Sequence, residues 1–427
     1  FRRFRQIYDS MIVSSQLYAR WEYETSMEII KDRRRFAAVL FITLLPMAIY
    51  TVAATELPEI LGGKHAYAPV HSTNEMLFTS ILIGLIAGLI TGCIGAGGGF
   101  VITPALMSIG VRGILAVGTD QFHIFAKSIV GTTVHKKLGN ISIALAVVFV
   151  VGSIIGATLG GVVNRAIFYA NPNLSDLFIN VIYVLLLGFL GIFALVDYVK
   201  LKKRVATFDG GDVQTAFDGG EIQTVGMTKI ATKVQSINLP PMITFDEEFG
   251  GRRVSAWFVL VCGFVVGVLC AIMGVGGGFL IFPMYVYLLG VSSFTTVGTS
   301  ILQIIFTTGY SSIVQYAIYG FVFYTLAMGL LLGSLLGIQI GALVTKVVKG
   351  LHIRGFYATT ILAGFINRLF ALPSKLSAAG WITIDKGISE ALSFLGLVVF
   401  FGILIVFAVW ILWKFATNID ALRGCKS

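Results

Sequence analysis

Three ionisable residues lie at helical spacing in an otherwise apolar part of the sequence. Asp120, His123 and Lys127 occupy positions i, i+3 and i+7, which share one face of a helix. Ionisable side chains are costly inside an apolar bundle and usually face a cavity or a partner. His123 and Lys127 could bind an anion, and Asp120 could pair with Lys127 or carry a proton. An internal salt bridge, or a lysine that reaches the membrane interface, would explain the same pattern without a ligand.

A glycine-rich motif precedes this region, and a second one precedes the corresponding region later in the chain. The first is Gly95-Ala-Gly-Gly-Gly-Phe-Val-Ile-Thr-Pro104, and the second is Gly274-Val-Gly-Gly-Gly-Phe-Leu-Ile-Phe-Pro283. Both lie in long apolar runs, although glycine and proline weaken or break helices. Broken backbone at membrane depth persists only where protein buries it or where it lines a cavity. The motifs therefore predict two interrupted helices around an inner site.

A half-helix that starts at such a break presents unpaired backbone N–H groups and the positive end of its dipole, which suits an anion. Thr119 and Thr299 could cap a helix or donate a hydroxyl to an oxyanion. Close helix packing by small residues is the alternative explanation of the glycines. The predicted substrate-binding residues are Gly97, Gly98, Gly99, Thr119, Asp120, His123, Gly276, Gly277, Gly278, Thr299, Ser300 and Gln303, with Arg112 and Lys127 as secondary candidates.

The second motif supplies a different polar face from the first. Ser300, Gln303 and Thr307 occupy the positions that align with Asp120, His123 and Lys127, and all three are uncharged. We therefore expect an asymmetric site whose charge comes from one half of the chain.

The composition is that of a polytopic membrane protein. Of 427 residues, 56% are hydrophobic and 12% are charged, too few polar side chains to cover a soluble globule of this length. The net charge of +10 reflects membrane topology rather than nucleic-acid binding, because the basic residues cluster beside apolar segments. The four cysteines show neither paired nor ligand spacing, so we expect no disulfide framework, metal site or cofactor.

The sequence predicts an all-α fold with two inverted repeats, each containing a broken helix or re-entrant hairpin, and extra flanking helices. Residues 98–134 favour a hairpin because about 13 apolar residues before the Val111-Arg112-Gly113 turn are too few to cross a bilayer. The tandem repeat Phe208–Gln223 would form either a small β element or a flexible linker. The expected parts are an amphipathic or solvated segment 1–35, a first transmembrane helix 36–54, repeat 1 at 76–199, a cytoplasmic linker 200–253, repeat 2 at 254–372, and an external loop, last helix and cytoplasmic tail at 373–427.

The distribution of lysine and arginine predicts the orientation. With both termini and the linker in the cytoplasm, 24 of the 31 basic residues lie inside and four lie outside. Such an asymmetry follows the positive-inside rule for an integral membrane protein. The membrane that we expect is the prokaryotic cytoplasmic membrane.

The two glycine motifs, each followed by a short second motif, resemble the paired signature of the TauE/SafE sulfite-exporter family. The second motifs are Ala116-Val-Gly-Thr119 and Thr296-Val-Gly-Thr299, and the resemblance covers roughly residues 76 to 372. It implies export or exchange of a sulfur-containing anion, such as sulfite or the organosulfonate sulfoacetate. Asp120 departs from the small polar residue that many members have after the Gly-Thr pair.

Inverted repeats with matching interrupted helices also favour a secondary transporter that works by alternating access, with protons as a candidate coupling ion. An anion channel is the alternative, and a homodimer is one open assembly. A membrane-embedded enzyme is disfavoured because the sequence has no Ser-His or HExxH arrangement, and the absence of a P-loop disfavours an ATP-driven pump.

Overall fold

The computed structural model describes residues 74–94, 99–135, 142–207, 229–245, 251–277, 280–281, 284–291, 293–344 and 350–418, together with 32–34, 37 and 348. The predictions for segment 1–35, for the first transmembrane helix 36–54 and for the tandem repeat therefore fall almost wholly outside the described residues. Within them the chain is helical except for one two-stranded sheet, so the predicted all-α class is confirmed.

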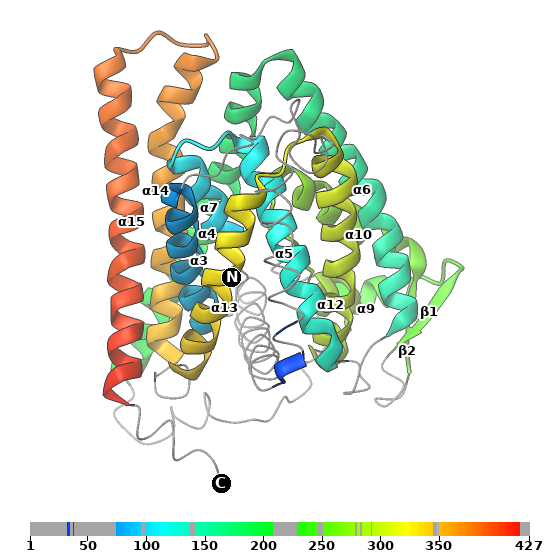
Figure 1. Ribbon diagram of the computed structural model, residues 1–427. Coiled ribbons are helices and arrows are strands. Elements are labelled where there is room, and N and C mark those ends of the chain that lie inside the picture. The colour runs from blue at the N-terminus through cyan, green and yellow to red at the C-terminus, as the bar shows by residue number, and fades with distance from the viewer. Residues whose placement is uncertain are drawn as a thin grey trace.

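The helices follow the order expected for two repeats (Figure 1). Repeat 1 contains α3 (Asn74–Ile94), α4 (Gly99–Ser108), α5 (Gly113–His135), α6 (Ile143–Ala170) and α7 (Pro172–Thr207). Repeat 2 contains α10 (Ala256–Met273), the π-helix η4 (Met284–Leu289), α12 (Ser293–Tyr310), the short turns η5 (Ser311–Tyr316) and η6 (Ala317–Tyr319), α13 (Tyr324–Val344) and α14 (Gly350–Ala378). The linker contributes α9 (Lys229–Gln235), β1 (Met242–Phe245) and β2 (Arg252–Ser255), and α15 (Lys386–Thr417) follows repeat 2.

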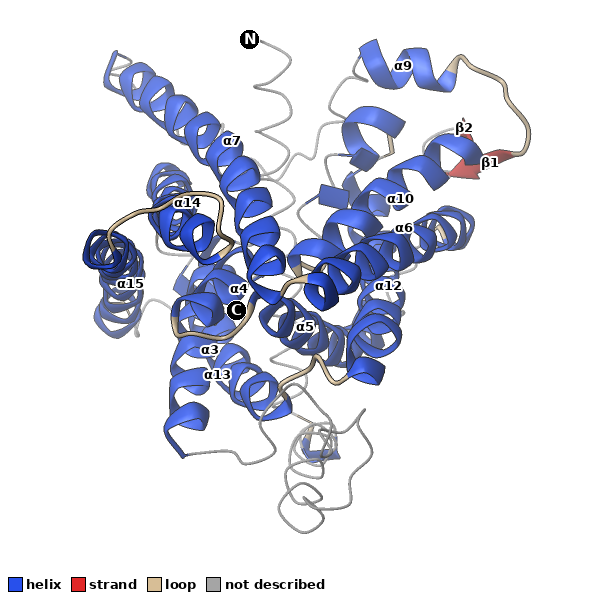
Figure 2. Ribbon diagram, turned by 90° about the horizontal axis from the view of Figure 1, so that it is seen from above, coloured by secondary structure: helices blue, strands red, loops and turns tan. Residues whose placement is uncertain are grey.

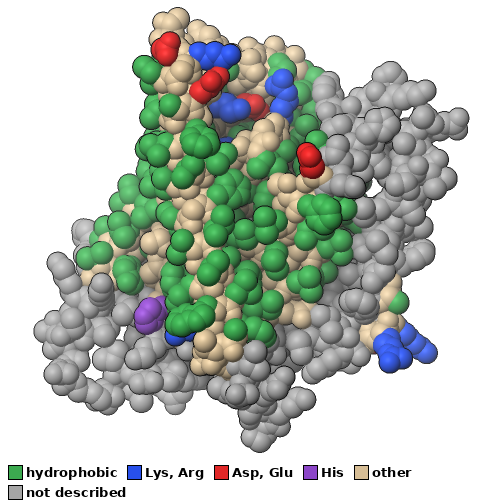
Figure 3. Space-filling model, turned by 60° about the vertical axis from the view of Figure 1, so that its left-hand side comes forward, with side chains coloured by type: hydrophobic (Ala, Val, Ile, Leu, Met, Phe, Trp, Pro, Cys, Tyr) green, Lys and Arg blue, Asp and Glu red, His purple; other side chains and the backbone are tan. Residues whose placement is uncertain are grey.

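Among the described helices, six are long and apolar enough to cross a bilayer: α6, α7, α10, α13, α14 and α15. Large apolar side chains cover their outer faces, for example Val151 on α6, Phe189 on α7 and Val406 on α15. Figure 3 shows this apolar surface, with charged side chains gathered towards its two ends. A soluble protein rarely exposes so large an apolar area, whereas lipid solvates it without cost. The chain is therefore an integral membrane protein.

Helix α3 of repeat 1 packs against helix α13 of repeat 2. Gly84 of α3 lies against Leu330 of α13, and Gly337 of α13 lies against Leu85 of α3, so residue numbers rise together and the helices run parallel. A Cβ atom at either glycine would lie 2.3 Å from a backbone oxygen of the facing helix. Only glycine allows this approach, as small residues do in membrane helix packing.

The same contact recurs between α6 and α10. A Cβ atom at Gly156 of α6 would lie 2.0 Å from the carbonyl oxygen of Phe264, and one at Gly267 of α10 would lie 2.1 Å from that of Ser153. Because α10 corresponds to α3 and α13 corresponds to α6, the two pairs are equivalent across the repeats. Each repeat thus packs its first helix on a helix of the other.

The ten-residue helix α4 and the 23-residue helix α5 lie in the middle of the bundle (Figure 2). The turn between them contains Gly110, whose φ is +93°, and the N–H of Gly113 donates to Asp176 Oδ1 at 2.8 Å. Asp176 also pairs with Lys375, whose Nζ lies 3.0 Å from its Oδ2. The tip of the first hairpin is therefore anchored to the start of α7 and, through Asp176, to the end of α14.

The linker covers the tip of the second hairpin. Gln235 Nε2 donates to the carbonyl of Leu289 at 2.7 Å, and Arg252 Nη1 donates to that of Gly290 at 2.9 Å. The strands β1 and β2 are antiparallel, with Met242 opposite Ser255. The linker thus has a β element, but its strands follow the tandem repeat in the chain, and the repeat itself lies outside the described residues.

We expect the α14–α15 turn and the linker to lie on opposite sides of the membrane. Thr383 and Ser236 are exposed at these two places, and Cys93, Cys262 and Cys270 are buried. In a Cys425→Ser background, a membrane-impermeant maleimide should label Thr383→Cys in intact cells and Ser236→Cys only after permeabilisation. Labelling of both in intact cells would exclude the inverted arrangement, and the background protein controls for native thiols.

The glycine contacts between the repeats should govern stability. Gly156→Ala places a methyl group into the backbone of α10 and should destabilise the protein by roughly 1 to 3 kcal/mol. Gly402→Ala on α15 is the matched control, because nothing lies within 4 Å of a Cβ there and alanine favours the helix. Melting temperatures in detergent should fall for the first variant and hold or rise for the second. Equal melting temperatures would show that close approach is not required.

Candidate functional site

A buried polar cluster joins the two repeats at the middle of α5. Asp120 is 0% exposed and His123 is 1% exposed. Thr103 Oγ1 of α4 donates to Asp120 Oδ2 at 2.8 Å, and Asp120 Oδ1 lies 3.6 Å from His123 Nδ1. On the other side, His123 Nε2 lies 2.9 Å from Ser334 Oγ of α13. The pattern of i and i+3 thus brings the predicted acid and imidazole together, with partners from both repeats.

His123 connects the acid to repeat 2. The Ser334 Oγ that it contacts also donates to the carbonyl of Leu331 at 3.2 Å. The opposite ring nitrogen of His123 faces Asp120 Oδ1. The two ionisable groups therefore form one buried pair, the Asp120–His123 unit.

Asp120 binds to the middle of a short helix. Helix α4 runs from Gly99 to Ser108, and Thr103, which donates to the Asp120 carboxylate, is the fifth of its ten residues. A helix dipole favours an anion at the first turn. The predicted half-helix site at Gly99 therefore lies about 6 Å along the helix axis from the residue that binds this carboxylate.

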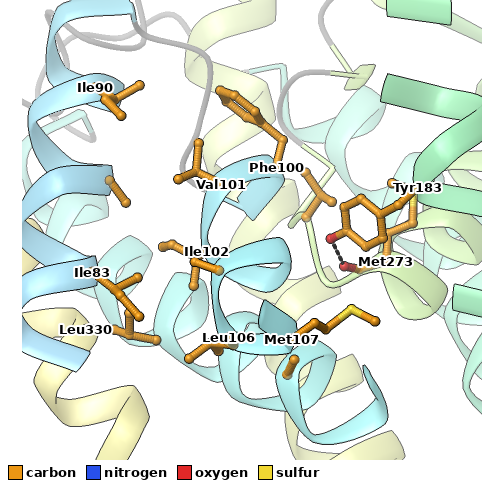
Figure 4. Close-up of a cluster of buried hydrophobic side chains, with 14 of the residues drawn as sticks. Ile83, Ile90, Phe100, Val101, Ile102, Leu106, Met107, Tyr183, Met273 and Leu330 are labelled. Carbon is orange, nitrogen blue, oxygen red and sulfur yellow. Dashed lines mark hydrogen bonds between the residues drawn. The ribbon is translucent and has the colours of Figure 1, made fainter. Parts of the chain in front are cut away.

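The two interrupted segments cross at this point. A Cβ atom at Gly99 would lie 2.6 Å from Val275 Cα, and one at Gly274 would lie 2.9 Å from Val117 Cα. Figure 4 shows Val101 and Ile102 of α4 among apolar side chains near the crossing, and the Tyr183 hydroxyl donating to the carbonyl of Met273. The glycines of each motif therefore bring the two repeats into backbone contact.

The end of α10 is satisfied by side chains that the sequence prediction missed. Gln121 Nε2 donates to the carbonyl of Cys270 at 2.6 Å, and the hydroxyls of Tyr183 and Tyr316 donate to those of Met273 and Ala271. A helix that ends in an apolar interior leaves such carbonyls without partners. Gln121 could have been suspected from its position beside Asp120, whereas nothing local marks the two tyrosines.

The second glycine motif has a strained backbone that requires glycine. Gly274, Gly276 and Gly277 have φ values of +78°, +71° and +76°. The carbonyl of Gly277 accepts from the N–H of Ile281 at 2.9 Å and so opens the half-helix. A Cβ atom at Gly276 would lie 2.8 Å from Ile124 Cδ1. Gly97, Gly98 and Gly278 lie outside the described residues.

The two threonines do not cap helices, contrary to one prediction. Thr119 lies inside α5 and Thr299 inside α12. Thr119 Oγ1 accepts from the N–H of Phe323 at 2.9 Å, and Thr299 Oγ1 accepts from that of Ser142 at 3.1 Å. Each hydroxyl binds the residue just before another helix, α13 for Thr119 and α6 for Thr299. The start of a helix has backbone N–H groups that need acceptors.

The remaining predicted residues lie in different surroundings. Gln303 is buried and its Nε2 donates to the Tyr285 hydroxyl, while Ser300 is 8% exposed on the same helix. Lys127 is partly exposed further along α5. Arg112 is exposed in the first hairpin turn, so it faces away from the cluster.

The chain was compared with known proteins. Residues 80–368 match the family model described as "Sulfite exporter TauE/SafE". It is 25% identical over 277 residues to "Probable membrane transporter protein YunE" of Bacillus subtilis (strain 168), which covers 62% of this chain and 87% of the relative. It is 24% identical over 303 residues to a "Probable membrane transporter protein" of Xylella fastidiosa (strain 9a5c), covering 70% of this chain and 92% of the relative. No solved structure matches. Because the matched segment spans more than half of the sequence, the chain belongs to the TauE/SafE sulfite exporter family.

Proposed function

We propose that this membrane transporter carries a small sulfur-containing anion, either sulfite or an organosulfonate such as sulfoacetate, across the prokaryotic cytoplasmic membrane. The family match and the names of the relatives support a transporter. The anion class is supported by the family description and by the start of α4 at Gly99, four residues before the Thr103 that binds the buried cluster.

The observation that carries the proposal is the buried Asp120 carboxylate, which is bound by Thr103 four residues after the start of α4. A carboxylate at about this distance repels a substrate anion at the helix start. Protonation of the Asp120–His123 unit removes this negative charge and so favours the substrate at the helix start. The anion and a proton therefore bind together and travel in the same direction.

Alternating access fits the arrangement of the repeats. The two interrupted segments cross at Gly99 and Val275, and each repeat exchanges a helix with the other. The first hairpin tip is held by Asp176 and the second by Gln235 and Arg252. Opposite tips that are each held by a few polar contacts favour a gate at either end over a continuously open channel.

Uptake of sulfite into proteoliposomes tests the proposed coupling. An inward proton gradient should stimulate uptake by the unaltered protein several-fold, and Asp120→Asn or His123→Gln should flatten the dependence on external pH. Asp385→Asn is the matched control, because this carboxylate caps α15 through the N–H of Ile388 and lies outside the cluster.

Two results would contradict the proposal at different points. Unaltered pH profiles in both cluster variants would remove the proton role. Sulfite uptake no faster than in empty liposomes would remove sulfite as a substrate, and sulfoacetate flux measured in the same way would then decide whether the anion class survives.

The second glycine motif should contribute to substrate binding as well as to backbone shape. Gly277→Ala should weaken sulfite binding because the added methyl group alters the backbone at the start of the half-helix. Gly110→Ala is a matched control, since it also replaces a glycine of positive φ but meets nothing within 4 Å. Both should lose about 1 kcal/mol or more of stability from the left-handed backbone, and only Gly277→Ala should lose affinity. Unchanged affinity in folded Gly277→Ala would assign this glycine to packing alone.

A further inference from the structure

Arg368 is a buried cation that forms no ion pair in the described part of the chain. It lies on α14, is 2% exposed and is the largest of the fully buried side chains. In the part of the chain that the structure describes, no carboxylate oxygen lies within the 4.0 Å ion-pair distance of its guanidinium. Ionisable groups at membrane depth are costly and usually serve a ligand or a partner.

The groups that contact Arg368 are neutral. Its Nε donates to Asn367 Oδ1 at 2.8 Å, and its Nη2 donates to the same oxygen and to Ser108 Oγ. These bonds use Nε and Nη2 and leave the Nη1 edge of the guanidinium for another acceptor. A guanidinium binds the oxygens of an oxyanion through two parallel N–H groups.

Arg368 lies near the Asp120–His123 cluster, at the end of α4. Ser108 is the last residue of α4, five positions after Thr103, so the two lie about 7.5 Å apart along the helix axis. Arg368 therefore stands between the cluster and the end of the bundle that holds Asp176 and Lys375.

A second buried arginine makes the contrast clear. Arg165 is 7% exposed, and its Nη1 donates to the Gln315 carbonyl at 2.5 Å and to Gln315 Oε1 at 2.7 Å. Its guanidinium also lies 4.0 Å from the ring centroid of Tyr319. A carbonyl, an amide and an aromatic face together stabilise this cation, whereas Arg368 has an amide and a hydroxyl.

We propose that Arg368 is an anion-binding residue, and that its guanidinium holds a sulfite- or sulfonate-type oxyanion between the Asp120–His123 cluster and the Asp176 end of the bundle. The class of anion rests on the proposed function. The assignment of Arg368 as a binding residue rests on its buried charge, which has no ion-pair partner among the described residues. Transport would then use two successive positions for the anion, one at Arg368 and one at the start of α4.

Asn367→Asp tests this with little change of shape. The variant places a carboxylate where the guanidinium already donates, so the site carries its own anion. Full-length protein should keep or gain melting temperature without sulfite, should lose the rise in melting temperature that sodium sulfite gives relative to sodium chloride of equal ionic strength, and should need at least tenfold more sulfite for half-maximal uptake.

Gln315→Glu is the matched control, because it gives Arg165 the same internal carboxylate. It should keep the unaltered half-saturating sulfite concentration and the sulfite-dependent rise in melting temperature. Arg368→Lys, which keeps the charge and loses the paired N–H groups, should fall between the unaltered protein and Asn367→Asp. If Asn367→Asp gives no folded protein, the sulfite-dependent rise in melting temperature and the half-saturating sulfite concentration of Arg368→Lys test the proposal instead.

The outcomes separate this inference from the proposed function. Folded Asn367→Asp with unaltered half-saturation and melting response would overturn the inference, and so would an equal shift in Gln315→Glu, which would indicate a general potential at this end of the protein. If sulfite stabilises the unaltered protein but not Asn367→Asp, and the unaltered protein transports no sulfite, Arg368 is upheld as a binding residue and transport of sulfite is rejected. A protein that sulfite neither stabilises nor crosses would reject both.

Discussion

A helix that ends inside an apolar bundle has backbone carbonyls that water cannot reach, and each unpaired one costs several kcal/mol. In this protein α10 ends at Met273 in such a place, and the hydroxyls and amide of Tyr183, Tyr316 and Gln121 satisfy its last carbonyls. These three side chains come from α7, η5 and α5. The break therefore fixes the positions of three other segments, and the polar cluster on α5 is placed by the same contacts.

The short helix α4 organises the charges around that break. Thr103 in its middle binds the Asp120 carboxylate, and Ser108 at its last position binds the Arg368 guanidinium. The helix therefore connects the buried acid of the cluster to the buried cation. An incoming anion can then interact with fixed groups that are already oriented, at a smaller cost of rearrangement.

The sequence predicted the geometry of the candidate site where the information is local. The spacing of Asp120 and His123 indicated a shared face, and the glycine motifs indicated the breaks, because both signals lie within one helix or one turn. Thr103 and Ser334 were missed because their role depends on which helices become neighbours. The capping role of Thr119 and Thr299 was wrong for the same reason, since each hydroxyl serves the start of a different segment. Arg368 was not among the predicted site residues, because burial without an acidic partner is a property of the folded bundle.

The exchange of helices between the repeats bears on how such a chain folds. A single repeat, from α3 to α7, exposes the glycine faces of α3 and α6, and both faces fit helices that run in the same direction as themselves but belong to the opposite repeat. Neither half of the chain can bury these faces alone, so each half depends on the other for its folding. The linker that joins the halves also bonds to Leu289 and Gly290, so it holds repeat 2 as well as connecting it to repeat 1.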